Sequence, residues 1–202
     1  MEKTLIDIRW ENEPDLDKLR QLHELAARDP KSATAGLVAL ADRGSAASMW
    51  YLADIYMGQD PALKSIDKGK HWYARAEKMG IVQASHMLGR ISFEQNDYDT
   101  AFSKFSVGQR AGYAPSAYRL ALMYGQGVGI PINKERCRML LAEAAVKGHL
   151  FAKRDLMTLY LRGAFGLRLF VRGITIAFSL LKDIVLLKSM RSGPELEERT
   201  LC

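Results

Sequence analysis

The sequence predicts an all-α protein, a right-handed α-solenoid of stacked antiparallel helix pairs. Glycines recur at nearly constant spacing, and the residues that follow each glycine repeat at the interval of one helix face. The residues that precede each glycine form a second pattern with helical spacing. The 202 residues are 48% hydrophobic and 26% charged, an ordinary globular composition that argues against disordered and fibrous classes.

Four glycines mark the repeat, separated by 36, 32 and 36 residues: Gly44, Gly80, Gly112 and Gly148. Small residues lie four positions after each glycine, leucines eight positions after, and a tyrosine twelve positions after in three of the four units. These rows are Ser48, Ala84, Ser116 and Ala152; Leu52, Leu88, Leu120 and Leu156; and Tyr56, Ser92, Tyr124 and Tyr160. Steps of four residues follow one stripe of a helix, and small residues let a second helix approach closely. We expect each glycine to end a helix in the left-handed conformation.

The second helix of each unit lies before the glycine. Seven positions before it are Leu37, Tyr73, Phe105 and Leu141. Upstream of the first marker, residues 16–28 and 33–43 form another helix pair divided by Asp29 and Pro30, and Pro30 is expected to start the second helix. We therefore expect an N-terminal helical cap over residues 1–30, a repeat array over 31–190 and a flexible tail over 191–202.

The pattern resembles the Sel-one-like (Sel1-like) repeat family, a branch of the tetratricopeptide-like superfamily. The matching residues are Leu120, Ala121, Tyr124, Gly127 and Gly129 in one unit, and Trp72, Tyr73, Ala74, Ala76 and Gly80 as a second helix. The resemblance covers residues 33–185, and Ser92 departs from it by replacing the tyrosine. It implies a non-catalytic scaffold or adaptor that binds a protein or peptide, as in bacterial signalling, surface-polysaccharide control or membrane-associated quality control.

In tetratricopeptide-like arrays the first helix of each unit lines the concave face. Carried over by repeat phase, the resemblance implies a partner-binding groove formed by Trp50, Asp54, His86, Arg90, Tyr118 and Arg154. Aromatic residues and arginine are enriched at interaction hot spots, so this groove is expected to hold an extended acidic or amphipathic peptide. The alternative is that Trp50 and Tyr118 only pack against their neighbours.

The C-terminal segment combines apolar and basic residues. Residues 161–190 carry five arginines or lysines against Asp183 alone, and we expect a helix over 173–190. The helix has more apolar residues than one packed face needs, and we expect Ile176, Leu180 and Leu187, together with the basic Arg168 and Arg172, to form a membrane- or partner-binding surface. This surface could meet an anionic membrane, a protein partner or a second copy in a homodimer, or it could pack internally. Its longest run without charge, residues 173–181, is too short to cross a bilayer.

No enzymatic, metal or cofactor site is expected. The glycine-rich segment 125–129 lacks the lysine of a phosphate-binding loop, and Cys137 and Cys202 match no zinc-ligand spacing. The four histidines form no pair at helical spacing, and Cys137 is expected to be a buried thiol. Helical repeats can bind RNA, but the basic residues form no stripe, so nucleic acid is an unfavoured alternative. Without a secretory signal near Met1, the cytoplasm is the expected compartment.

Overall fold

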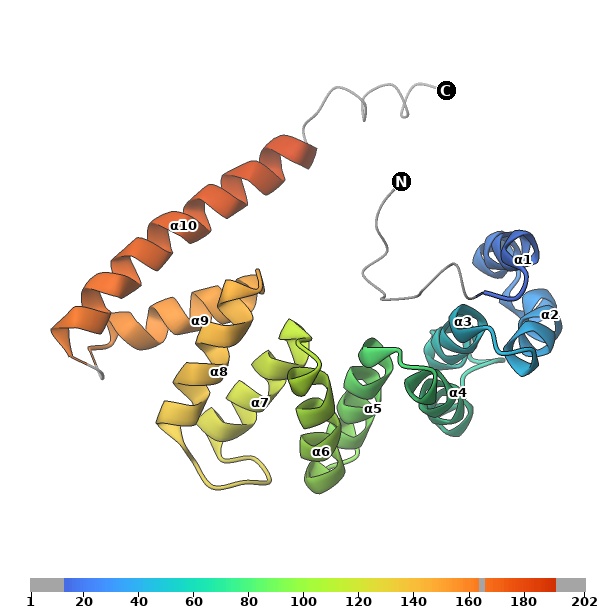
Figure 1. Cartoon of the computed structure of the whole chain (residues 1–202), viewed down its shortest axis with the longest axis horizontal. Helices are drawn as coiled ribbons and strands as arrows, with labels where there is room; N and C mark the ends of the chain where they lie inside the picture. The colour runs from blue at the N-terminus through green and yellow to red at the C-terminus, as the bar shows by residue number, and fades with distance from the viewer. Residues whose placement is uncertain (1–12, 164–165, 192–202) are drawn as a thin grey trace. The chain divides into compact units, whose positions relative to one another are not determined.

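The computed structural model describes residues 13–163 and 166–191. This part of the chain is helical without strands, and consecutive helices pack against each other, so the all-α solenoid class is confirmed (Figure 1). Its helices are α1 Leu16–Arg28, α2 Pro30–Asp42, α3 Ala46–Met57, α4 Ile66–Lys78, α5 Val82–Glu94, α6 Tyr98–Arg110, α7 Ala114–Gln126, α8 Lys134–Val146, α9 Leu150–Leu161 and α10 Leu167–Arg191.

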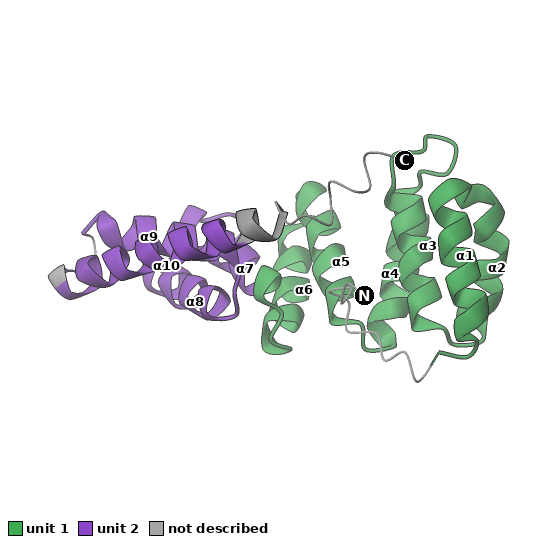
Figure 2. Cartoon of the chain, turned by 90° about the horizontal axis from the view of Figure 1, so that it is seen from above, with its two compact units in different colours: residues 1–116 green, residues 117–202 purple. Residues whose placement is uncertain are grey.

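The chain divides into two compact units, residues 1–116 and 117–202 (Figure 2). In the first unit, α1 packs on α2, α3 on α4 and α5 on α6, and α2–α3 and α4–α5 contacts join these pairs. In the second unit, α8 packs on α9 and α9 on α10. Each helix therefore has a neighbour on both sides through most of the first unit, as expected when no single pair can bury its own apolar face.

The four marker glycines adopt the predicted conformation. Their φ angles are +95° at Gly44, +88° at Gly80, +86° at Gly112 and +85° at Gly148. After each glycine the next backbone N–H returns to a carbonyl of the last helical turn, as in the 3.0 Å bonds from Ser45 to Leu40 and from His149 to Ala144. This bond satisfies a carbonyl at the helix end, so each glycine closes one unit and begins the next.

The predicted rows form the cores of the units. The small row and the leucine row are buried in all four repeats, and so are the large residues that precede each glycine. The small residues matter because they allow close helix contact: a Cβ on Gly89 of α5 would lie 2.8 Å from the Phe105 ring of α6. Phe105 itself is completely buried, so its ring fills the space that the glycine leaves.

The start of α2 agrees with expectation, the start of α10 differs from it, and parts of the expected cap and tail lie outside the described residues. The last helix begins at Leu167, six residues earlier than predicted, and continues through Gly173. That glycine fits inside the helix because α9 comes close: a Cβ there would lie 3.0 Å from the Cβ of Tyr160. Pro30 begins α2 as predicted. Most of the expected tail, residues 192–202, and residues 1–12 of the expected cap lie outside the described residues.

Candidate partner-binding surfaces

The first unit has an apolar cavity between α1, α3 and the segment after α3. Its volume is about 520 Å³. The lining residues are His23, Ala26, Ala27, Pro30, Trp50, Tyr51, Asp54, Ile55, Gly58, Gln59, Asp60 and Leu63. The rings of His23 and Tyr51 lie 4.6 Å apart and connect α1 to α3. The cavity is therefore a hydrophobic depression with two carboxylates among its lining residues.

Two predicted residues, Trp50 and Asp54, lie together on this cavity. They are four residues apart on α3, so they share one helix face. Tyr73 of α4 donates a 2.5 Å hydrogen bond from its hydroxyl to Oδ1 of Asp54, and the Trp50 indole stacks edge-on against Tyr73 at 5.2 Å. The hydrogen bond from Tyr73 therefore holds one carboxylate oxygen of Asp54 in place.

Burial sets the charge behaviour of this group. It raises the pKa of Asp54 above its usual value, although hydrogen bonds from Tyr73 and Trp50 act in the opposite direction. Burial also raises the pKa of Tyr73 strongly, and the nearby negative charge of Asp54 adds to this effect. Tyr73 therefore acts as a neutral hydrogen-bond donor across the physiological range.

Arg90 and His86 lie on α5 in different surroundings. Arg90 is close enough to Tyr73 for its positive charge to lower that residue's pKa, and its Nη2 lies 3.7 Å from the carboxylate of Glu94. His86 is only 8% exposed, its Nδ1 lies 3.1 Å from Ser116 Oγ, and its ring packs on Phe105 and Tyr113. The structure thus places His86 in the core of the first unit, because the small row leaves room for its ring between the helices.

The remaining two groove residues belong to the second unit. The Tyr118 hydroxyl donates a 2.8 Å hydrogen bond to Asp155, and Arg154 donates to the other carboxylate oxygen at 2.8 Å. The His149 ring lies 4.5 Å from the Tyr118 ring and accepts the backbone N–H of Ala152 at its Nδ1, which caps α9. Burial lowers the pKa of His149, so the ring stays neutral and keeps this cap.

On α10 the residues assigned to the apolar and basic surface differ in burial. Ile176 and Leu180 are half-buried, and Ile176 shares a cavity with Leu156 and Tyr160 of α9. The side chain of Leu187 lies outside the described set. The register explains the difference, because the close contact at Gly173 turns residues three and seven positions later toward α9. Arg168 and Arg172 are exposed.

Sequence reasoning missed three residues that shape these sites. Tyr73 was assigned to a core row, and it does belong to the core, yet its hydroxyl reaches the site. Asp155 follows Arg154 directly but is out of phase with the predicted lining positions. His23 lies before the first repeat, where no periodic signal points to it.

The described residues hold no group of three or more histidine, cysteine, aspartate or glutamate side chains that could bind a metal ion. Cys137 is half-buried, and burial raises the pKa of its thiol, the largest effect on that group. A thiol with a raised pKa has little thiolate at neutral pH and is a poor nucleophile. Within the same described ranges, no helix is both long and apolar enough to span a membrane.

The fold defines an all-α helical repeat protein. The Sel1 repeat model matches residues 46–81 and 114–149 of this chain. These matches correspond to α3–α4 and α7–α8 with their closing glycines. Sel1 repeat proteins generally mediate protein–protein interactions. A search of curated protein sequences finds no match.

Solved structures agree with the fold. A Sel1 repeat protein from Oxalobacter formigenes superposes with a TM-score of 0.69 and 18% identity, covering 80% of this chain and 71% of that one. The protective antigen c5321 from uropathogenic Escherichia coli, which has the SLR fold, superposes with a TM-score of 0.67 and 19% identity, covering 86% of this chain. This chain spans only 42% of the antigen's length.

Proposed function

We propose that the protein is a non-catalytic scaffold that binds a peptide segment of a partner protein, with the cavity between α1 and α3 as a principal contact site. The observation that carries this proposal is the 520 Å³ apolar cavity lined by Trp50 and Tyr51. Cavities of this size and composition suit one or two large side chains of a bound segment. Trp and Tyr are also the residue types that dominate binding energy at interfaces.

The charges around the cavity refine the expected ligand. Asp54 and Asp60 line it, and among the residues that the structure describes no lysine or arginine does. Arg90 and Arg154, on which the acidic-peptide prediction depended, each face a neighbouring carboxylate, Glu94 at 3.7 Å and Asp155 at 2.8 Å. The geometry therefore favours a segment with an aliphatic or aromatic side chain beside a lysine or arginine.

The test is selection of displayed random peptides on the full chain, followed by binding measurements on a variant with a filled cavity. Ala27→Trp places a large ring in the cavity from an exposed position of α1, so it blocks the site without entering the core. The matched control is Ala111→Trp, at an exposed position after α6. Selected peptides should be rich in apolar–basic pairs and should bind the Ala27→Trp chain at least tenfold more weakly than the control.

Two results would contradict the proposal. Equal affinity of the selected peptides for both tryptophan variants would place the binding site elsewhere. Selection of mainly acidic peptides would show that the arginine-bearing surfaces, and not the cavity with Asp54, govern recognition.

A further inference from the structure

The outer face of α10 carries an exposed apolar stripe. Its members are Val171, Ile174, Phe178, Leu181 and Val185, which follow each other at alternating steps of three and four residues. This alternation keeps them on one side of a helix. Phe178, near the middle of the stripe, is 71% exposed. Soluble proteins rarely leave such a contiguous row of large apolar side chains uncovered.

The opposite face of α10 is already used. Gly173 lies against Tyr160 of α9, and Asp183 forms a 2.5 Å ion pair with Lys153 of the same helix. Both contacts hold α10 on α9 along most of the length of α9. The stripe is therefore surplus to internal packing, and a helix that is apolar on two faces needs a second covering surface.

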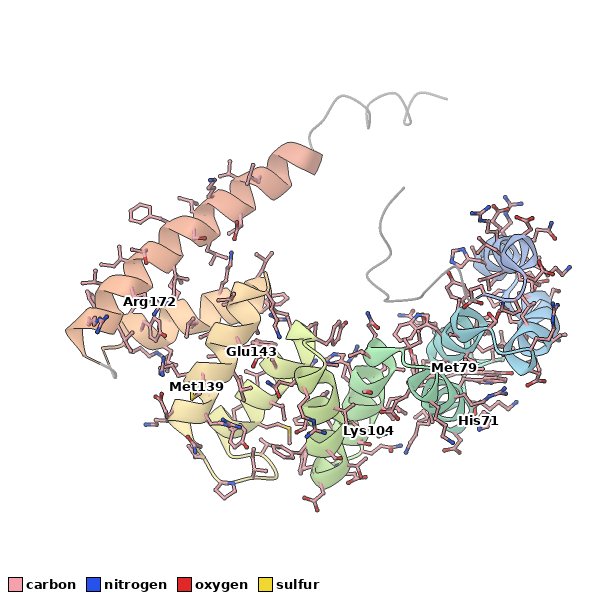
Figure 3. The ribbon with its side chains drawn as sticks, in the orientation of Figure 1. His71, Met79, Lys104, Met139, Glu143 and Arg172 are labelled. Atoms are coloured by element: carbon pink, nitrogen blue, oxygen red, sulfur yellow. The ribbon has the colours of Figure 1, made fainter. Side chains whose placement is uncertain are left out.

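Basic side chains border the stripe on one side. Arg168 and Arg172, with Arg138 of α8, line a cavity of about 690 Å³ that also includes Val171 of the stripe (Figure 3 labels Arg172). Glu135 is in that cavity too, but it forms a bidentate pair with Arg138. Arg168 and Arg172 have no ion pair with a carboxylate in the part of the chain that the structure describes.

Lys182 adds another exposed cation on the same flank, and the only acid in the α10 sequence, Asp183, is paired with Lys153. An apolar stripe beside unpaired positive charge is complementary to a surface in which a negatively charged outer layer covers an apolar interior. That is the layering of an anionic lipid bilayer at its interface.

We propose that the outer face of α10 docks the protein on an anionic lipid membrane. The stripe enters the boundary between headgroups and acyl chains, and Arg168, Arg172 and Lys182 contact lipid phosphates. A helical protein partner fits less well, because a coiled-coil seam is narrow and bordered by charges of both signs. Here Ile184 and Leu186 are also exposed and widen the apolar surface. Among the α10 side chains that the structure describes, those with a charge and no ion pair are Arg168, Arg172 and Lys182, all positive. A second copy would bring two basic flanks together.

The test is flotation of the full chain with vesicles of phosphatidylcholine, with and without phosphatidylglycerol. Binding should need phosphatidylglycerol and should weaken with added salt. Phe178→Asp should lower the partition coefficient at least about tenfold, because it removes a large buried apolar contact and adds repulsion. Arg168→Gln with Arg172→Gln should lower it about twenty-five-fold, since each basic residue near such a surface contributes roughly fivefold.

Matched controls separate this surface from general effects. Ile66→Asp changes another exposed apolar residue, and Arg28→Gln with Arg110→Gln removes the same charge from exposed arginines of the first unit. These variants should bind vesicles as the unaltered chain does, and so should Ala27→Trp, whose cavity serves the separate peptide-binding proposal. Circular dichroism checks that all variants keep their helices.

Several outcomes would overturn the membrane proposal. These are no binding to either vesicle, equal binding with and without phosphatidylglycerol, or equal losses in the α10 variants and their controls. Sedimentation without lipid covers the other occupant: a dimer that Phe178→Asp converts to a monomer, with no vesicle binding, would assign the stripe to a second copy.

Discussion

Replacing Gly89 by alanine measures how closely α5 and α6 approach each other. A Cβ at this position would lie 2.8 Å from two ring carbons of Phe105 and 3.3 Å from the Cβ of Lys104. Phe105 is completely buried, so its ring has no solvent-filled space to move into. Overpacking of this kind costs roughly 1–3 kcal/mol, and the better helix propensity of alanine returns about 1 kcal/mol. We expect a net destabilisation of about 1 kcal/mol.

A double-mutant cycle with Phe105→Leu tests the cause. The leucine removes the ring, so in that background Gly89→Ala should be neutral or stabilising, which corresponds to a coupling energy of about 1–2 kcal/mol. The measurement is urea unfolding followed by circular dichroism, with equal m-values required for comparison. Ser103→Ala, at an exposed position of α6, controls for helix propensity alone. The same cost of Gly89→Ala in both backgrounds would refute the argument that the ring sets it.

Three further predictions concern titration and capping. Burial raises the pKa of Asp54. The contribution of this group to the free energy of unfolding is therefore complete at pH values below the ordinary range of an aspartate and is lost as the pH rises through the raised value. In the Asp54→Asn variant the free energy of urea unfolding should depend less on pH between pH 4 and pH 7, and an unchanged profile would contradict this. Burial lowers the pKa of His149 from 6.5, so its contribution is present above that value and is lost as the pH falls through the lowered value, and His149→Asn, which can also cap α9, should remove this loss in the same assay. Ser45 caps α3 and bonds to Glu13, so Ser45→Ala should cost roughly 1–2 kcal/mol in thermal or urea unfolding, whereas a loss below the error of the measurement would show that Glu13 caps the helix alone.

The repeat could be predicted from the sequence because each rule behind it is local. A glycine such as Gly44 adopts positive φ because it has no Cβ, and the rows that follow it are spaced by the pitch of a helix. These constraints act within about a dozen residues of the chain, so they can be recognised from the sequence alone. The pairing of Trp50 with Asp54 belongs to the same class, because four residues on one helix place two side chains side by side.

The cavity was beyond such reading because it joins segments that lie far apart in the sequence. His23 meets Tyr51 only because α1 packs on α3, and Tyr73 reaches Asp54 across the α3–α4 contact. Periodicity assigns Tyr73 to the core without showing where its hydroxyl points. It likewise places Arg154 on a surface without showing that the adjacent Asp155 holds its guanidinium.

The sequence by itself therefore determined the all-α repeat, the glycine that closes each unit and the identity of the core rows, since these depend on backbone conformation and helical pitch. It also showed that the C-terminal helix has more apolar residues than one packed face needs. Only the tertiary structure decided which of them are surplus, because the rotation of α10 is set where Gly173 meets Tyr160. That contact turns Ile176 toward α9 and leaves Phe178 in solvent.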